Sequence, residues 1–258
     1  MTTLRILAYN VNSASPKRLE RLHKLLDTID ADIIALTEAD HQEVIEELAG
    51  RLGLQHVWAA GSGDRHVATL SRFPIEAWDI HSKPPLTQAA LQTKLALPTR
   101  YITIFNIHFL PYLLLPFEVR RWQAVGRLQE IICNGEIGPH LIVGDLNAIG
   151  RGDRVLQRNN PTRMRRVMAL QLNLIFRLAV PRLLRAGYTD CFRQLHPEQD
   201  GFTFMTGNPT TRYDYVIADK QFSPTLRTCQ VVDDLPDLET LSDHFPLLAE
   251  FEIGEADA

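Results

Sequence analysis

The feature that most constrains this chain is a short apolar stretch that runs directly into a glycine and an acid. Leu141, Ile142 and Val143 are bounded by turn-forming residues, a pattern typical of a strand that is buried on both faces. Asp145 and Asn147 follow at once, two residues apart, so in an extended chain their side chains share one face. The segment predicts either a polar site at the mouth of a buried strand or, as readily, an ordinary turn that caps the strand.

The first part of the chain alternates between strand and helix patterns. Residues 4–12 and 32–38 are apolar runs typical of strands, and each is followed by apolar residues at helical spacing, over residues 16–28 and 42–52. An alternation of this kind indicates an α/β fold or a layered α+β arrangement.

The remainder of the chain is dominated by strand patterns. The expected strands are residues 67–71, 91–97, 101–109, 141–143, 202–204, 213–218, 228–232 and 245–253. One long helix is expected over residues 117–132. Its inward side is expected to carry Val119, Trp122, Val125, Leu128, Ile131 and Ile132. No internal repeat interrupts the pattern.

Polar residues able to do chemistry lie at the ends of these strands or beside their apolar runs. They are Asn10, Glu38, His108, Asp145, Asn147, Asp214, Asp243 and His244. Taken singly, an acid at a strand end is more often a solvated residue, and a histidine on an apolar strand is more often a core residue. Their recurrence at strand after strand predicts one shared polar site.

The segments that contain these residues resemble the motifs of the endonuclease/exonuclease/phosphatase superfamily, and they occur in that family's order over essentially the whole chain. They are Tyr9-Asn10-Val11-Asn12, residues 34–38, residues 70–75, Asn106-Ile107-His108, Gly144-Asp145-Leu146-Asn147, residues 212–216 and Ser242-Asp243-His244-Phe245-Pro246. The resemblance implies an α+β fold, a four-layered α/β sandwich in which two packed mixed β-sheets are flanked by helices. It also implies a single domain over residues 1–258.

The branch of the superfamily is indicated by segments outside these motifs. Residues 187–197 are similar to enzymes of the exonuclease III type. However, Phe-Leu-Pro follows His108, and residues 202–205 stand where those enzymes carry a Trp-rich segment. These departures argue against abasic-site repair, and the Asn-x-His motif favours the phosphodiesterase and phosphatase branches.

The resemblance also implies a metal ion and assigns roles to the site. Magnesium prefers oxygen ligands, and Mn²⁺ is expected to substitute for it. The expected metal ligands are Asn10, Glu38 and Asp243. The expected catalytic residues are His108, Asp145, Asn147, Asp214 and His244. Asp145 is expected to orient or deprotonate the attacking water, and Asp214 to hold His244, which acts as a base or as a phosphate-binding cation. The expected substrate-binding residues are Asn12, Asn106, Arg163, Arg165 and Arg166.

The predicted function is that of a magnesium-dependent phosphoester hydrolase, and in particular of a phosphodiesterase. One alternative is a nucleic-acid endonuclease or exonuclease of the exonuclease III type, and another is an inactive module that binds a phosphate ligand. The net charge of -4 argues against binding nucleic acid through overall charge. The three cysteines lack zinc or disulfide spacing, and no run has the length of a spanning helix, so a cytoplasmic protein is expected.

An arginine-rich insert, residues 151–185, is not explained by the family motifs. It holds nine arginines against one acid, Asp153, and a further apolar insert, residues 110–117, follows His108. Residues 164–184 are mostly apolar between the arginines, with Pro181 as a break, and predict one or two amphipathic helices that start near Thr162. Such a segment can meet an anionic membrane surface, contact nucleic-acid phosphates or simply pack on the domain. Both inserts leave strand ends that bear site residues, so they are expected near the mouth of the site.

Overall fold

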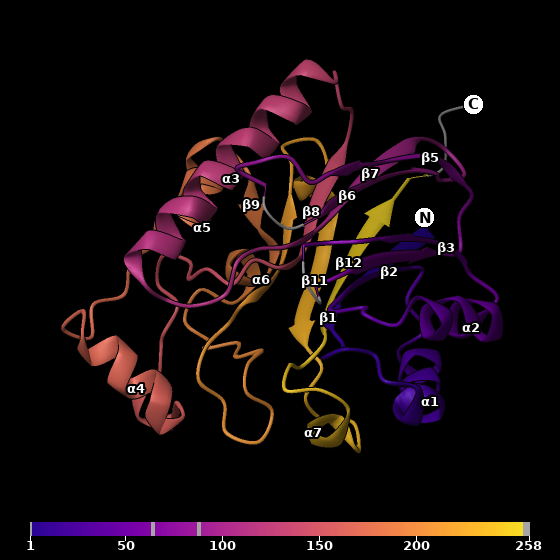
Figure 1. Cartoon of the computed structure of the whole chain (residues 1–258). Helices are drawn as coiled ribbons and strands as arrows, with labels where there is room; N and C mark the ends of the chain where they lie inside the picture. Colours follow the sequence, from indigo (N-terminus) through magenta and orange to yellow (C-terminus); the bar gives the residue numbers. More distant parts are fainter. Residues whose placement is uncertain (1, 63–64, 87–88, 255–258) are drawn as a thin grey trace.

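The fold is a pair of six-stranded sheets packed face to face, seen in a computed structural model that describes residues 2–62, 65–86 and 89–254 (Figure 1). The strands of the first sheet are β1 (Thr2–Asn10), β2 (Ile33–Thr37), β3 (Gln55–Ala59), β4 (Val67–Ser71), β11 (Leu226–Val231) and β12 (Leu247–Ile253). Those of the second are β5 (Ile75–His81), β6 (Ala90–Ala96), β7 (Tyr101–His108), β8 (His140–Asp145), β9 (Thr189–Asp190) and β10 (Asp214–Ala218). The spatial orders are β11-β12-β1-β2-β4-β3 and β5-β6-β7-β8-β10-β9.

Helices cover the outer face of each sheet. The α-helices are α1 (Leu19–Ile29), α2 (Gln42–Leu52), α3 (Leu115–Asn134), α4 (Thr162–Ala169), α5 (Ala179–Arg185), α6 (Cys191–Leu195) and α7 (Leu238–Leu241). Three 3-10 turns lie at Pro16–Arg18, Gln157–Asn159 and Ser223–Thr225. Helices α1 and α2 lie on the first sheet, whereas α3 and α5 lie on the second (Figure 1). The predicted four-layered sandwich is therefore confirmed.

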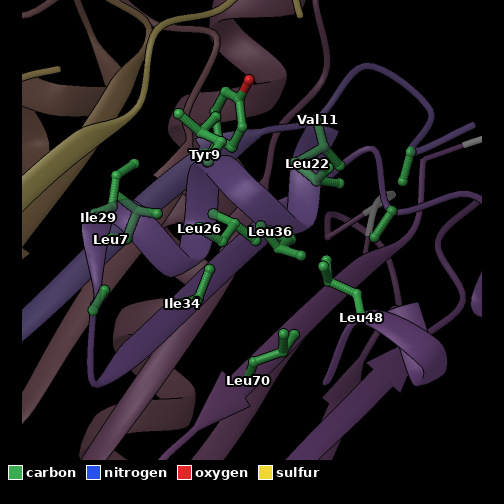
Figure 2. Close-up of a cluster of buried hydrophobic side chains, with 14 of the residues drawn as sticks. Leu7, Tyr9, Val11, Leu22, Leu26, Ile29, Ile34, Leu36, Leu48 and Leu70 are labelled. Atoms are coloured by element: carbon green, nitrogen blue, oxygen red, sulfur yellow. The ribbon is translucent and has the colours of Figure 1, made fainter. Parts of the chain in front are cut away.

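Three apolar clusters hold the layers together. Between the sheets, Ile6 and Ile33 share a buried cluster with Ile104 and Val143. On the outside of the first sheet, side chains of α1 and α2 bury the facing side chains of β1, β2 and β4 (Figure 2). Helices α3 and α5 bury the opposite sheet in the same way. Burying one such aliphatic side chain contributes roughly 1.5–3 kcal/mol, so the layers are held mainly by apolar burial.

Strand register brings the polar strand ends together. Strands β7 and β8 are parallel, and His108 pairs with Asp145. Strand β10 runs antiparallel to β8, and Asp214 also pairs with Asp145. In the first sheet β1 and β2 are parallel, so Asn10 lies beside Thr37, the residue before Glu38. The sequence pattern becomes a site because these registers align strand ends from both sheets.

The strands that the sequence did not predict are edge strands. Strand β3 has two buried residues of five, and β5 has none of seven, so neither carries a strong apolar pattern. The strand predicted over residues 202–204 is wrong, since Phe204 makes only isolated bridges, to Thr211 and His244. The predicted helix starting near Thr162 is confirmed as α4, but Pro181 is no break, because it lies in the first turn of α5.

The predicted inward side of α3 is partly wrong. Val119 and Trp122 are 36% and 40% exposed, whereas the charged residues Glu118 and Arg121 are buried. Glu118 accepts hydrogen bonds from the backbone N–H groups of Leu178 and Ala179 at 2.6 and 2.9 Å. Buried charges are tolerated where they are paired, and the 2.8 Å ion pair between Glu118 and Arg121 meets that condition.

Two further expectations concern cysteines and membrane spans. Cys133, Cys191 and Cys229 are free thiols, as their spacing predicts. Within the described residues, no helix combines the length and the apolar character needed to cross a bilayer.

Candidate active site

The aligned strand ends open into a cavity of about 200 Å³. The wall is formed by Glu38, Arg65, Pro111, Tyr112, Asp145, Asn147, Met164, Phe204, Tyr213, Asp243 and His244. Five of the residues predicted for the site therefore face one space, and both inserts contribute to its rim. His108, Asp214 and Asn10 lie directly behind this wall and contact it, as described below.

Two carboxylates from different sheets meet at the cavity. The side-chain amide of Asn10 donates to Glu38 Oε1 at 3.2 Å and to Asp145 Oδ2 at 3.1 Å. One N–H₂ group therefore holds the two acids side by side. Burial raises the pKa of Glu38 above its usual range. Burial, followed by the nearby charge of Asp214, raises the pKa of Asp145. Both shifts arise mainly because burial disfavours the charged form of a carboxyl group.

The orientation of Asn10 bears on its predicted role. Its side-chain oxygen accepts a hydrogen bond from the backbone N–H of Asn12 at 3.0 Å, so its amide N–H₂ faces the acids. In this orientation Asn10 positions the carboxylates of Glu38 and Asp145, and its role as a metal ligand stays a prediction.

Backbone geometry places Asp145 and Asn147. Gly144 has φ +124°, and a Cβ there would lie 2.3 Å from the carbonyl oxygen of Ile107, so only glycine lets β8 run this close to β7. Asn147 adopts φ +46°, so the chain turns, and the expected extended conformation is wrong. The backbone N–H of Asn147 donates to Asp145 Oδ1 at 2.8 Å, and its side-chain amide donates to the Phe109 carbonyl at 3.1 Å. The turn and the polar site, stated above as alternatives, are both present.

His244 is paired with a buried acid. Its Nδ1 lies 2.7 Å from Asp214 Oδ2, and its Nε2 lies 3.8 Å from Asp145 Oδ2. Burial alone would lower the pKa of His244, but the charge and hydrogen bond of Asp214 outweigh it and raise the pKa to about 10. The backbone N–H of His244 donates to Ser242 Oγ, which donates to the carbonyl of Asn10. At neutral pH His244 is therefore a fixed imidazolium beside Asp145.

His108 behaves in the opposite way. Burial, reinforced by the charges of Arg65 and His244, lowers its pKa to about 3. Its Nε2 lies 3.8 Å from Glu38 Oε1 and 3.7 Å from Asp145 Oδ2, and within the described part of the chain neither ring nitrogen makes a hydrogen bond. Since the ring is neutral, these contacts are not ion pairs. A neutral imidazole with unused ring nitrogens can donate to one further group in the cavity.

Several predicted substrate-binding residues lie elsewhere. Asn106 is fully buried and donates to the carbonyls of Leu36 and Ala68 at 3.0 and 2.8 Å, so it links the two sheets and cannot reach a substrate. Asn12 is not part of the cavity wall, and its carbonyl accepts from Arg18. The prediction for Asn106 is therefore wrong, because its amide is used to satisfy backbone carbonyls. The substrate-binding role of Asn12 stays a prediction.

The arginines of the insert divide into two groups. Arg177 donates to the carbonyls of Gly150 and Asp153 at 3.2 and 3.0 Å. Arg182 donates to Gln129 and lies 4.4 Å from the centre of the Trp122 ring. These side chains hold the insert on the domain. In contrast, Arg163, Arg165 and Arg166 of α4 are exposed and outside the cavity wall, although they flank Met164 in the sequence.

The cavity also contains residues that the sequence analysis did not select. Arg65 brings a cation to the wall, and its charge acts on Glu38 and His108. Phe204 and Tyr213 form the apolar side, with ring centres 5.3 Å apart. Tyr213 could have been found from its position beside Asp214 in a motif, whereas no local pattern marks Arg65.

Oxygen donors able to hold a divalent cation face the cavity from three directions. Glu38, Asp145 and the exposed Asp243 line it. Within the described residues, ligand atoms of Asp145, Asp214 and His244 also lie within 4.8 Å of one another. Asp214 and His244 are hydrogen-bonded to each other, however, so Glu38 and Asp243 are the carboxylates better placed to hold a cation. Carboxylate oxygens suit a hard cation such as Mg²⁺.

Comparisons with known proteins agree with this architecture. Residues 7–244 match the sequence profile described as the endonuclease/exonuclease/phosphatase family. None of the curated protein sequences matches the chain. A 3'-5' exonuclease from Neisseria meningitidis is 20% identical, with TM-score 0.74 over 97% of this chain and 100% of that chain. An AP endonuclease from Archaeoglobus fulgidus is 20% identical, with TM-score 0.72 over the same shares of the two chains.

A third similar structure was solved with nucleic acid. It is the 3' phosphatase NExo from Neisseria bound to a product DNA hairpin, which is 20% identical, with TM-score 0.72 over 97% of this chain and 100% of that chain. At this level of identity the structural likenesses establish the fold.

Proposed function

This chain belongs to the endonuclease/exonuclease/phosphatase family, whose members hydrolyse phosphoric esters, and from this premise we propose that it is a magnesium-dependent phosphodiesterase. The observation that carries the proposal is the pair of acids, Glu38 and Asp145, held together by Asn10 beside the Asp214–His244 pair. A phosphodiester needs charge neutralisation and a water held in line with its leaving group, and this arrangement contains groups for both.

The metal is proposed from the donor set. Glu38 and Asp243, which both line the cavity, are the proposed ligands of Mg²⁺ or Mn²⁺, and Asp145 is left free to act as the base. A bound divalent cation would act as a Lewis acid toward a phosphate oxygen. Asn10 keeps Glu38 and Asp145 in place by donating to both.

The remaining residues are assigned from their protonation states. Asp145 accepts a proton from the attacking water, because its raised pKa gives its carboxylate more basicity than an ordinary aspartate has. His244, protonated and fixed by Asp214, donates from Nε2 to a phosphate oxygen. The neutral ring of His108 donates a second hydrogen bond, and Asn147, whose amide nitrogen is already used, offers its carbonyl oxygen to the water.

The test is hydrolysis of a small phosphodiester, methyl p-nitrophenyl phosphate, with Mg²⁺, with Mn²⁺ and with excess chelator. We expect turnover with either metal and none with the chelator. Glu38→Ala should remove most of the activity, while Glu76→Ala, which removes the same charge from an exposed position on β5, should leave it unchanged. Near-normal turnover by Glu38→Ala at saturating Mg²⁺ would refute the ligand assignment, and absence of turnover under all conditions would favour an inactive phosphate-binding module.

A nuclease is the second candidate, since one similar structure holds a DNA hairpin. A panel of double- and single-stranded DNA, RNA, inositol phosphates and phospholipid headgroups separates the two candidates. Turnover of nucleic acid at least about tenfold above the other substrates, the difference made by 1.4 kcal/mol at the transition state, would favour the nuclease.

We further propose that the arginine-rich insert brings the enzyme to an anionic membrane surface in the cytoplasm. Arg163, Arg165 and Arg166 are exposed on α4 and are followed by Leu170 and Leu172, which are 85% and 82% exposed. Cations beside exposed apolar side chains suit a lipid surface better than a nucleic-acid backbone, because the apolar groups gain nothing from phosphates. Retention on DNA without retention on vesicles would reject this proposal.

A further inference from the structure

An apolar groove of about 450 Å³ lies between the two inserts. Its wall is formed by Tyr112, Leu113, Leu114, Phe117, Pro161, Arg163, Met164, Val167 and Met168. One side comes from the loop after β7 and the start of α3, and the other from α4, which lies at the edge of the molecule far from α1 and α2 (Figure 1). The volume falls within the range of roughly 300–1,000 Å³ that small-molecule sites occupy.

The groove adjoins the candidate active site. Tyr112 and Met164 belong to the walls of both spaces, so they lie at the boundary between them. A molecule whose phosphodiester lies between Glu38 and His244 would reach the groove by passing Tyr112 and Met164.

The two sides of the groove are held together by specific hydrogen bonds. The side-chain amide of Gln171 donates to the carbonyl of Leu113 at 2.7 Å, and its oxygen accepts from the backbone N–H of Leu115 at 3.3 Å. Arg121 donates to the carbonyls of Leu110 and Tyr112 at 2.6 and 3.0 Å. The Gln171 bonds connect the segment after α4 to the loop opposite, and the Arg121 bonds hold that loop on α3, so both sides of the groove are fixed by the fold.

The wall of the groove selects the chemistry of its occupant. Leucine, methionine, valine and phenylalanine side chains offer no hydrogen bonds, and the one charged residue, Arg163, is a cation on α4. At the open end of α4, Leu170, Leu172 and Leu174 are exposed. An apolar groove that adjoins a phosphoester site fits a hydrocarbon chain that is attached to a phosphate.

We propose that the substrate is an amphiphilic phosphodiester whose hydrocarbon chain lies in the groove between α4 and the 110–117 loop while its phosphate lies in the cavity. This inference rests on the proposed function and names its substrate class. Nucleobases are a poorer fit, because only Tyr112 and Phe117 offer rings and these already contact each other, with centres 5.2 Å apart.

The first test is binding, which does not depend on turnover. Decyl phosphate and methyl phosphate are compared by calorimetry below the micelle concentration, with the full chain and Mg²⁺. We expect decyl phosphate to bind at least about tenfold more tightly, since each buried methylene strengthens binding several-fold. Equal affinities would overturn the groove proposal whether or not the protein is a hydrolase.

The second test is turnover of two diesters that share a leaving group, methyl and decyl p-nitrophenyl phosphate. We expect kcat/KM to be at least about tenfold higher for the decyl ester, for the same reason. Equal turnover of both esters would overturn the groove proposal and leave the proposed function standing. Absence of turnover for both, with tight binding of decyl phosphate, would overturn the function and leave the groove standing.

A matched pair of variants tests whether the hydrocarbon chain of the ligand lies in the groove. Val167→Trp adds bulk within the groove, and Ala169→Trp adds the same bulk to the exposed end of α4. The ratio of the affinities for decyl phosphate and methyl phosphate should fall toward one in Val167→Trp and stay high in Ala169→Trp. Thermal melting checks that both variants fold. A preference that survives in Val167→Trp, or an oligonucleotide that binds in a Val167-dependent way where decyl phosphate does not, would overturn the proposal.

Discussion

At the scale of single residues, the same side chain acquires opposite properties in one site. His244 and His108 both lie close to Asp145, yet His244 is a cation at neutral pH and His108 is neutral. The difference arises because Asp214 pairs with His244, whereas His108 is buried without a hydrogen-bonding partner among the described residues. Hydrogen bonding to the charged form raises a histidine pKa, and burial alone lowers it.

The acid and the imidazolium of the site should both be essential for turnover. Asp145→Asn and His244→Ala are each expected to lower kcat by about 10² or more, the scale of positioned acid–base and electrostatic groups. Asp27→Asn and His23→Ala make the same chemical changes on α1, far from the cavity, and should leave kcat unchanged. Steady-state kinetics on methyl p-nitrophenyl phosphate provides the measurement. If kcat falls by less than about tenfold in both site variants, Asp145 and His244 are not the catalytic groups.

The protonation states predict a bell-shaped pH profile. Asp145 must be ionised to accept a proton, so kcat/KM should rise as pH rises through its elevated pKa, above the ordinary aspartate value of about 3.9. His244 must be protonated to donate, so kcat/KM should fall as pH approaches its pKa of about 10. His244→Gln, which cannot lose a proton, should remove the alkaline fall. An alkaline fall that persists in this variant would show that another group causes it.

At the scale of secondary-structure elements, α3 carries two ion pairs with the same spacing and very different surroundings. Glu118 and Arg121 are both buried, whereas Arg127 and Glu130 are exposed and lie 2.9 Å apart. Removing one partner of a buried pair leaves an uncompensated charge, whereas an exposed pair is screened by water. The buried pair also anchors the start of α5 and the 110–112 loop, so it holds the two inserts in place.

The two pairs provide a test with a built-in control. Glu118→Gln is expected to lower the free energy of unfolding by about 3–5 kcal/mol. Glu130→Gln makes the same change on the same helix and should alter the free energy of unfolding by about 1 kcal/mol or less. Denaturant unfolding monitored by circular dichroism measures both. Equal effects would show that Arg121 finds another partner when Glu118 loses its charge.

Helix α4 should account for attraction to an anionic surface. Replacing Arg163, Arg165 and Arg166 with glutamine should weaken binding to vesicles that contain anionic lipid, since each arginine near such a surface contributes about 1 kcal/mol. Vesicle co-sedimentation at increasing salt measures the effect, and binding should fall as salt screens the charges.

The control for α4 removes three charges from a different face. Lys17 in the turn before α1 and Arg21 and Lys24 on α1 are exposed, and their replacement with glutamine should leave vesicle binding intact. A similar loss in both triple variants would show that overall charge, rather than α4, governs binding.

At the scale of the whole molecule, a buried ionic network joins segments that are distant in sequence. Arg212 donates to Asp190 Oδ2 at 2.5 Å and to Asp153 Oδ2 at 3.0 Å, and Asp153 also accepts from Arg193 and Tyr215. The network therefore connects the start of β10, the end of β9 and the arginine-rich insert. Arg212 lies next to the site in sequence, but its role is to hold these segments together.

This network predicts lower stability in acid. Burial alone would raise the pKa of Asp153, but Arg212 and Arg193 outweigh it and lower the pKa. A depressed pKa contributes stability above the unfolded value of about 3.9, and this contribution is lost as pH falls through the folded value. The difference in unfolding free energy between the wild type and Asp153→Asn should therefore be larger at neutral pH than in acid. A difference that is constant with pH would show that Asp153 contributes through packing instead of charge.

The sequence by itself determined the layered fold and most of the polar residues that line the site. Buried strands and amphipathic helices are set by local apolar periodicity, so β1, β2, β8, α1 and α2 could be predicted from their residues alone. The edge strands β3 and β5 could not, because they bury few side chains. Glu38, Asp145, Asp243 and His244 could be selected because each lies at the end of a clear strand pattern or just before one. Their catalytic and metal-binding roles remain predictions.

Only the tertiary structure decided which polar groups face the cavity and which are used to hold the fold. Asn10 and Asn106 stand in similar motifs, yet Asn10 contacts Glu38 and Asp145 while Asn106 bridges the two sheets. Arg65 and the groove beside α4 also depend on segments that meet only when the chain is folded. The physical reason is that strand register and layer packing set the burial and the hydrogen-bond partners of each side chain. Neither the register nor the packing can be predicted from a short stretch of sequence.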